Sequence, residues 1–379
     1  MMQYTPPMGW NTWNTFGGDI NEQLVLDAAD GLVRSGLAAA GYRYVVIDDC
    51  WHLPFRDGKG DMVPDPEKFP HGMQALAEKI HEKGLLFGMY SCAGNLTCAG
   101  LPGSFDNEFR DARMFADWGV DFLKYDYCYH TPVLKAMYHY RRMGAALANC
   151  GREILFSACS WGAEETQEWI RTTGAQMWRS TGDIYDSWAS VKGIITAQDR
   201  LYPYGGVGCF NDMDMLVVGM NGKGNTGYDQ QGCTPEEYKT HFSAWCLFGS
   251  PLMVGCDVRN LSPEVKAMLT NPDAIAINQD PACRQVYAVS PWSGNPADMV
   301  RVRLLANGDF AVGIFNLNDS STQIVCAMDE MGLPRHCGKK LLLRDVWTGE
   351  YHNPENGTLQ AKLQAHDSLL MIGKLVDDD

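Results

Sequence analysis

The sequence predicts an α/β protein, a (β/α)8 TIM barrel followed by a C-terminal antiparallel β domain. Up to about residue 280, short apolar runs alternate with amphipathic segments, which is typical of βα units in a parallel sheet. Polar residues follow several of these runs, at the strand ends where a barrel carries its active site. Beyond Asn278-Gln279-Asp280 the apolar positions alternate, as in antiparallel strands with one buried face.

The first part of the chain accommodates eight strands and the helices between them. Met73, Leu76, Ala77 and Ile80 fall on one face of a helix that Gly84 ends. No GxGxxG follows the first strand, and the strands recur over roughly 250 residues, so a barrel is favoured over a doubly wound sheet. The predicted strands are 8–13, 44–49, 85–90, 122–126, 154–159, 176–179, 207–211 and 252–255.

The last part of the chain predicts a β domain. Residues 299–304 and 310–315 alternate, and Asn307-Gly308-Asp309 between them is a strong hairpin signal. Residues 341–347 and 368–372 continue this pattern. We therefore expect a catalytic barrel over residues 1–282 and an antiparallel domain over residues 283–379.

Charge and composition exclude several classes of protein. The 379 residues carry a net charge of −15, which repels nucleic acid. No apolar run reaches the length of about 18 residues that a membrane span requires. The charge therefore excludes nucleic acid as an expected partner, and the lack of a long apolar run excludes a membrane. The N-terminus lacks the features of a signal peptide, which predicts a cytoplasmic protein, or a secreted or periplasmic one if a leader was removed. Thirteen cysteines without a CxxC pair predict no zinc site.

Acidic residues at the strand ends are the candidate chemical groups. Asp48 and Asp49 follow a buried strand, where an unpaired carboxylate is costly. Lys124 and Asp126 share one face of a strand, either as a structural ion pair or with the lysine keeping a nucleophilic Asp126 ionised. Asp183 lies four residues after Arg179, within reach of an ordinary ion pair, unless its environment raises its pKa for proton donation.

Cleavage of a glycosidic bond requires two carboxyl groups, which different strand ends can supply. A separation of about 5 Å predicts retention of configuration and a larger one of about 8 Å predicts inversion, so the residues alone leave both open. Phosphate-loop, HExxH and GxSxG motifs are absent from the sequence. The chain is thus a candidate glycosidase, with an inactive sugar-binding barrel as the remote alternative.

Five blocks in the barrel region resemble glycoside hydrolase family 27, which contains α-galactosidases and α-N-acetylgalactosaminidases. The blocks occur in the family's order along nearly the whole barrel. They are PMGWNTW (7–13), VIDDCW (46–51), LKYD (123–126), WR with GDI (178–184) and NDMDML (211–216).

This resemblance implies a (β/α)8 TIM barrel followed by a C-terminal antiparallel β-sandwich domain. It also implies a retaining double displacement that needs no metal or cofactor. Asp126 matches the family's nucleophile and Asp183 its acid/base residue. Cys98 and Cys128 match a family disulfide, although free thiols remain the alternative in a reducing compartment. The resemblance further implies substrate-binding roles for Trp13, Asp48, Asp49, Tyr90, Cys98, Lys124, Arg179, Asp214 and Met215. Family members are often dimers, so a homodimer is a further expectation.

The loop at residues 159–163 bears on the substrate. Ser160 and Ala163 resemble the small residues of α-N-acetylgalactosaminidases, whereas α-galactosidases usually carry larger ones there. A serine donor and open space suit an N-acetyl group, so the sequence favours terminal α-N-acetylgalactosaminides over terminal α-galactosides. The alternative is a repacked loop filled by Glu164 or Trp161. The effect of Tyr127, where relatives carry a smaller residue, and the nature of the leaving group are left open.

Overall fold

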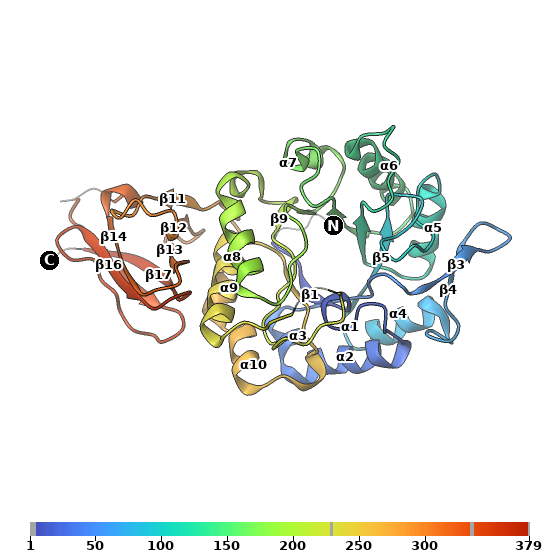
Figure 1. Ribbon diagram of the computed structural model, residues 1–379, viewed down its shortest axis with the longest axis horizontal. Helices are drawn as coiled ribbons and strands as arrows, with labels where there is room; N and C mark the ends of the chain where they lie inside the picture. Colours follow the sequence, from blue (N-terminus) through green and yellow to red (C-terminus); the bar gives the residue numbers. More distant parts are fainter. Residues whose placement is uncertain (1–4, 228–229, 334–336, 378–379) are drawn as a thin grey trace.

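A computed structural model describes residues 5–227, 230–333 and 337–377. A helix-covered barrel occupies one part of the molecule and an antiparallel β domain lies beside it (Figure 1). The eight parallel strands of the barrel run in the order β10-β1-β2-β5-β6-β7-β8-β9. A bridge between Leu216, just after β9, and Val254 of β10 joins the two edges of this sheet. These strands are β1 (Met8–Asn11), β2 (Tyr44–Val46), β5 (Leu86–Cys92), β6 (Phe122–Asp126), β7 (Leu155–Cys159), β8 (Met177–Arg179), β9 (Phe210–Asp212) and β10 (Leu252–Val254).

The eight predicted barrel strands are confirmed, and helices connect them. The predicted face of α4 is correct, since Met73, Leu76, Ala77 and Ile80 are all buried. The helices are α1 (Trp13–Phe16), α2 (Glu22–Ser35), α3 (Leu37–Ala40), α4 (Gly72–Glu82), α5 (Glu108–Asp117), α6 (Ala136–Ala148), α7 (Thr166–Trp169), α8 (Trp188–Ala197), α9 (Pro235–Phe248), α10 (Pro263–Leu269) and α11 (Pro272–Asn278).

A hairpin of β3 (His52–Arg56) and β4 (Met62–Pro64) interrupts the βα pattern. It projects from the barrel on the side away from the β domain (Figure 1). Arg56 anchors it through two hydrogen bonds of 2.7 Å to the carboxylate of Asp111 on α5. The sequence did not predict these strands because their prolines and charges mask the alternation of apolar residues.

The β domain contains a five-stranded and a two-stranded antiparallel sheet, which agrees with the predicted sandwich. The larger sheet has the order β11-β12-β13-β17-β15, and β14 pairs with β16. Residues such as Val300, Val312, Ile324 and Leu359 form a core between the sheets. The strands are β11 (Tyr287–Val289), β12 (Asp298–Leu304), β13 (Phe310–Asn316), β14 (Thr322–Ala327), β15 (Lys339–Asp345), β16 (Thr358–Leu363) and β17 (Ser368–Asp377).

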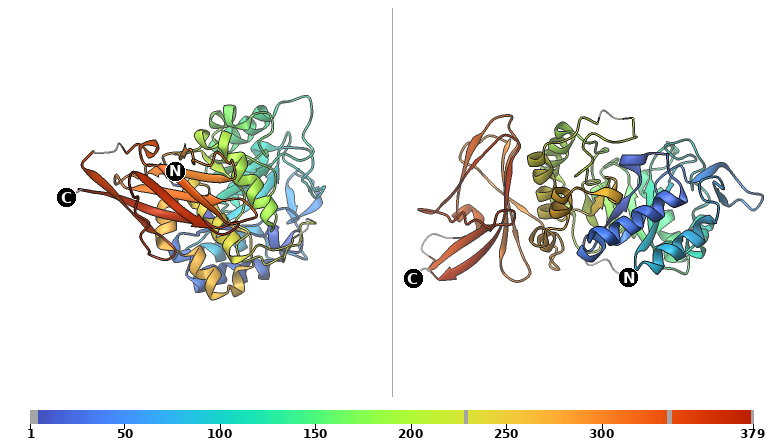
Figure 2. Two further views of the ribbon diagram at one scale, coloured as in Figure 1. Left: turned by 60° about the vertical axis from the view of Figure 1, so that its left-hand side comes forward. Right: turned by 90° about the horizontal axis from the view of Figure 1, so that it is seen from below.

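The larger sheet packs against the barrel through α9, which is buried along most of its length (Figure 2). Phe315 and Met299 of this sheet belong to the same apolar cluster as the barrel core. Arg303 of β12 is 2% exposed and donates to the carbonyl oxygens of Ile277 at 3.0 Å and Leu247 at 3.4 Å. The two parts therefore share one continuous packed interface.

Among the described residues, no helix combines the length and apolar character needed to cross a membrane.

Candidate active site

A cavity of about 210 Å³ lies at the C-terminal ends of the barrel strands. Its walls come from loops that are far apart in the sequence but adjacent around the barrel mouth. The lining residues are Trp13, Asn14, Asp48, Asp49, Tyr90, Cys98, Lys124, Asp126, Arg179, Asp183, Ile184, Asp214, Met215 and Thr226. The structure thus brings together both predicted catalytic carboxylates and all predicted binding residues except Ser160 and Ala163.

Asp126 ends β6 and is held from both sides of its carboxyl group. Oδ1 accepts the backbone N–H of Tyr127 at 2.9 Å, and Oδ2 accepts the Tyr90 hydroxyl at 2.9 Å. The side chain is buried, and this burial raises its pKa to about 6, although Lys124 and the two hydrogen bonds oppose the rise. Because both oxygens are fixed, Asp126 presents its carboxylate in one orientation.

Lys124 bonds Asp48 directly, not Asp126. Its Nζ lies 2.8 Å from Oδ2 of Asp48, an oxygen that also accepts Asn11 Nδ2 at 2.7 Å. Burial acts to lower the pKa of Lys124, but the acidic groups around it, Asp48 first and Asp126 among the others, together outweigh burial and the pKa is raised. The predicted direct pair of Lys124 with Asp126 is therefore wrong. The segment after β2 brings Asp48 to the lysine, which bonds this carboxylate in place of the one two residues along its own strand. The lysine charge still favours ionisation of Asp126.

Asp49 is fixed by the backbone of two loops. Oδ1 accepts the N–H of Cys50 at 2.7 Å and Oδ2 accepts the N–H of Ala99 at 3.0 Å. Burial raises the pKa of Asp49, and these hydrogen bonds counter the rise. Asp48 and Asp49 are consecutive, yet both line the cavity, because the strand has already ended at Val46.

Arg179 links two carboxylates across the cavity floor. Nη2 contacts Asp183 Oδ1 and Nη1 contacts Asp214 Oδ1, both at 2.9 Å. The guanidinium is 3% exposed, whereas the Asp183 side chain is 42% exposed. Asp214 also accepts the N–H of Ile184 at 2.7 Å, so one carboxylate holds both the arginine and the segment after Asp183. The predicted Arg179–Asp183 ion pair is confirmed.

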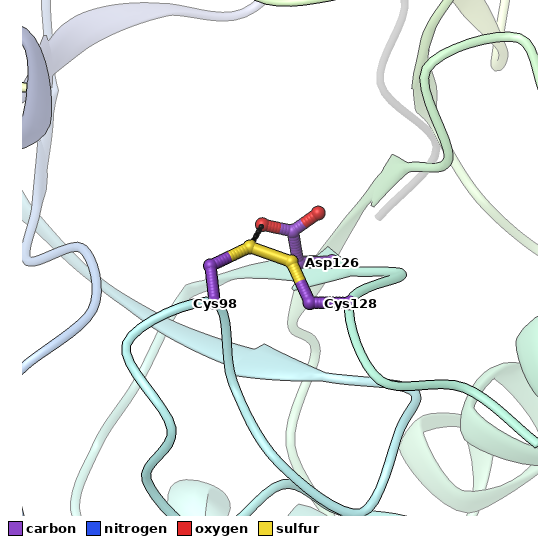
Figure 3. A group of neighbouring side chains, drawn as sticks. All are labelled: Cys98, Asp126 and Cys128. Carbon is purple, nitrogen blue, oxygen red and sulfur yellow. Dashed lines mark hydrogen bonds between the residues drawn. A yellow bond between two sulfur atoms is a disulfide. The ribbon is translucent and has the colours of Figure 1, made fainter. Parts of the chain in front are cut away.

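Cys98 and Cys128 form the predicted disulfide, with their Cα atoms 5.3 Å apart. Figure 3 shows the bridge beside the carboxylate of Asp126. Cys98 Sγ lies 3.4 Å from Asp126 Oδ2. This grouping of two cysteines and an aspartate resembles a metal site, but sulfurs bonded to one another are not the thiolates that bind metals. The disulfide instead fixes one wall of the cavity.

Known proteins match this chain over nearly its full length. A family model described as Alpha galactosidase A matches residues 5–280, and one described as Alpha galactosidase C-terminal beta sandwich domain matches residues 300–372. The chain belongs to glycoside hydrolase family 27. It is therefore a glycoside hydrolase, and its barrel and β domain are those of the family.

Individual relatives agree with this assignment. An alpha-galactosidase from Cyamopsis tetragonoloba is 42% identical over 369 residues, covering 96% of this chain and 84% of the relative. The crystal structure of alpha-galactosidase I from Mortierella vinacea is 33% identical, with a TM-score of 0.90 and coverage of 98% and 97%. An alpha-galactosidase from Saccharomyces cerevisiae, solved with raffinose, is 29% identical, with a TM-score of 0.87 and coverage of 98% of each chain.

Ser160 and Ala163 do not line the cavity, which contradicts their predicted placement in this family 27 site. Ser160 is fully buried, and its hydroxyl lies 2.7 Å from Oγ1 of Thr166, which itself donates to the Ala163 carbonyl at 2.7 Å. Because the threonine proton is used on that carbonyl, the serine proton points to the threonine. Ser160 therefore has no proton left for a ligand.

Tyr127 explains why this loop is packed away from the cavity. Its ring is buried, stacks on His130 with centroids 3.8 Å apart and lies edge-on to Trp161 at 6.3 Å. Its hydroxyl donates to Glu164 Oε1 at 3.2 Å, and Glu164 Oε2 accepts the first N–H of α6 from Ala136. The large residue at position 127 thus ties the loop to α6, which matches the repacked-loop alternative.

Three lining residues were not predicted: Asn14, Ile184 and Thr226. Asn14 and Ile184 directly follow predicted site residues, so proximity along the chain was the available signal. Thr226 lies in the glycine-rich segment between β9 and α9, where no periodicity indicates which side chain faces inward.

Proposed function

We propose that the protein is a retaining, exo-acting α-galactosidase that releases terminal α-linked D-galactose from oligosaccharides. The observation that carries this proposal is that Asp126 and Asp183 line one and the same small cavity at the barrel mouth. Its volume of 210 Å³ is below the range of about 300–1,000 Å³ common for drug-sized ligands, and it suits one sugar ring. The family's α-galactosidases support the chemistry.

In the first step Asp126 is the nucleophile. Its ionised carboxylate attacks the anomeric carbon, forming a bond to the enzyme while the bond from that carbon to the glycosidic oxygen breaks. Asp183 gives its proton to the departing oxygen. The Tyr90 and Tyr127 hydrogen bonds hold the Asp126 oxygens, so little reorientation is needed on the way to the transition state.

In the second step the roles of proton donor and acceptor reverse. Asp183 takes a proton from water, and the water oxygen attacks the anomeric carbon while the bond to Asp126 breaks. The exposure of Asp183 is consistent with this role, because water and the leaving group must both reach it. Two displacements at one carbon restore the α configuration.

The remaining cavity residues supply recognition of a galactose-configured ring. Carboxylates such as Asp48 and Asp49 accept hydrogen bonds from sugar hydroxyls, and Lys124 donates one. In this proposal the two aspartates bind the 4- and 6-hydroxyls, and Trp13 packs against the apolar face of the ring. Tyr90, Cys98, Arg179, Asp214 and Met215 complete the walls.

Galactose is preferred over N-acetylgalactosamine in this proposal because Ser160 lies outside the cavity with its proton already engaged. The alpha-galactosidases among the relatives support the same choice, including the one solved with raffinose. Hydrolysis of p-nitrophenyl α-galactoside and its α-N-acetylgalactosaminide should be compared side by side. We expect kcat/KM to favour the galactoside by more than tenfold, and the reverse preference would reject the proposed substrate.

The stereochemical course needs its own measurement. Proton NMR of the first sugar released should show the α anomer before mutarotation produces the β anomer. Initial appearance of the β anomer would show inversion and exclude the covalent intermediate on Asp126.

A further inference from the structure

The segment between β9 and α9 covers the barrel mouth beside Asp183. The described residues of this segment are 213–227 and 230–234, and they include Thr226, which lines the same cavity as both catalytic candidates. None of the roles assigned above uses Thr226. We call residues 221–227 and 230–233 the β9–α9 loop.

Contacts with two other loops fix the position of the β9–α9 loop. Asn225 donates from Nδ2 to the carbonyl oxygen of Phe16 at 3.2 Å. A Cβ at Gly17, whose φ is +53°, would lie 2.2 Å from the Asn225 carbonyl oxygen, so this close approach requires glycine. Asn14 of α1, the short helix that Gly17 ends, donates to the carbonyl oxygen of Ile184 at 3.3 Å. Thr226 is therefore placed next to the segment that carries Asp183.

A short hydrogen-bond chain orients the Thr226 hydroxyl. The backbone N–H of Asp186 donates to Gln230 Oε1 at 2.7 Å, and Gln230 Nε2 donates to Thr226 Oγ1 at 2.9 Å. A backbone N–H can only donate, so the orientation of the Gln230 amide is determined. The Thr226 oxygen accepts from Gln230, and none of the described residues accepts the Thr226 proton, so this proton can be donated to a ligand.

The Asp186 side chain anchors the same loop. Its carboxylate is fully buried and accepts the N–H of Gly222 at 2.7 Å and the Tyr238 hydroxyl at 2.9 Å. The Asp186 carbonyl oxygen accepts the N–H of Gly232 at 2.8 Å. Asp186 lies only three residues after Asp183. One short segment thus carries the proton donor and fixes the loop that holds Thr226.

We propose that the Thr226 hydroxyl, oriented by Gln230, donates a hydrogen bond to the leaving-group sugar and determines preference for carbohydrate over aryl leaving groups. This assignment rests on the proposed function. An acid/base residue protonates the oxygen shared with the leaving group, so groups beside Asp183 at the mouth face that part of the substrate. A sugar offers hydroxyl oxygens there, whereas p-nitrophenol offers none at the same positions.

The test compares Thr226→Val, which keeps the shape but removes the hydroxyl, with Thr226→Ser, which keeps the hydroxyl. For Thr226→Val we expect kcat/KM for raffinose to fall about 3- to 10-fold, the range for one hydrogen bond, with less than a twofold change for p-nitrophenyl α-galactoside. Thr226→Ser should retain the wild-type ratio. Gln230→Leu should lower the raffinose value in the same direction, because the hydroxyl loses its orientation.

Two results would overturn the assignment while leaving the proposed function intact. Unchanged raffinose kinetics for Thr226→Val would show that the hydroxyl makes no substrate contact. An equal loss for both substrates would place its contact on the galactose ring. A wild-type protein inactive on p-nitrophenyl α-galactoside would instead reject the proposed function, and the assignment with it. Equal melting temperatures of the variants would separate loss of contact from loss of fold.

Discussion

The Tyr90 hydroxyl and the Asp126 carboxylate are joined by a hydrogen bond of 2.9 Å, and both side chains are almost fully buried in the wall of the cavity. The bond favours the ionised form of Asp126, while burial raises the Asp126 pKa to about 6. The reactivity of this carboxylate is therefore a balance between burial and its partners.

Tyr90→Phe should lower kcat/KM for p-nitrophenyl α-galactoside by about 10- to 100-fold, because a hydrogen bond to a charged group is lost. It should also move the acidic limb of the pH profile. In the wild type that limb is expected near pH 6, since Asp126 must be ionised to attack. Without the hydroxyl the Asp126 pKa rises further, so the limb moves to higher pH. If the acidic limb stays at the same pH in Tyr90→Phe, the Tyr90 hydroxyl does not influence the pKa of Asp126.

Asp126→Ala should lower turnover by more than about 10³-fold while leaving the melting temperature close to that of the wild type. The space left by the carboxylate can admit a small anion. Added azide should then attack the anomeric carbon directly and yield β-galactosyl azide. Formation of the α-azide by this variant would show that residue 126 is not the nucleophile.

Asp183→Ala should behave differently with the same reagents. Nitrophenolate departs with little protonation, so the covalent intermediate still forms, but its hydrolysis is slow without a general base. Azide should accelerate turnover and yield α-galactosyl azide, with the configuration of the substrate. A raffinose substrate should lose far more activity than the nitrophenyl substrate, and equal losses would argue against acid catalysis by Asp183.

Asp212→Asn tests how much the burial of an acidic side chain near Arg179 lowers the stability of the fold. Asp212 is 6% exposed, and burial raises its pKa to about 7, with the Asp214 charge contributing and Arg179 opposing. The folded protein therefore keeps this proton between about pH 4 and pH 7 while the unfolded chain loses it, so this group's contribution to stability falls as pH rises through that window.

Asparagine cannot lose this proton. The variant should be more stable than the wild type at pH 7.5, on the order of 1–3 kcal/mol, and should show little advantage at pH 4. Thermal unfolding at both pH values measures the difference. Asp329→Asn, at an exposed site, controls for the removal of one negative charge. An advantage that is equal at both pH values would contradict the assigned titration.

Removing the disulfide should affect both stability and catalysis. The residues of the Cys98–Cys128 bridge are separated by 30 positions, and losing a bridge of this span costs about 2–4 kcal/mol of unfolding free energy. Because Cys98 touches Asp126, we also expect kcat/KM to fall at least about tenfold in Cys98→Ser/Cys128→Ser. Cys337→Ser, which replaces an exposed free thiol, is the matched control. Wild-type activity in the double variant would show that the bridge does not shape the site.

The sequence predicted the barrel well because its strands are apolar runs that end in polar residues. It also predicted that Asp126 and Asp183 share one site, since carboxyl ends of parallel strands meet at one edge. It failed where contacts depend on distant packing. The partner of Lys124 is set by the neighbouring strand, and the orientation of Ser160 is set by Thr166 and Tyr127. Thr226 depends on loop geometry, which leaves no periodic trace in the sequence.

The Arg303 guanidinium, which caps carbonyl groups at Leu247 and Ile277, has a practical consequence for anyone who wishes to shorten this enzyme. Deleting the β domain would expose the apolar side of α9 and remove the Arg303 donor from the carbonyl groups of Leu247 and Ile277. Such a truncated barrel should aggregate when expressed alone. Minimised or chimeric versions therefore need to retain the sheet that carries Arg303, or to supply a redesigned polar surface on α9.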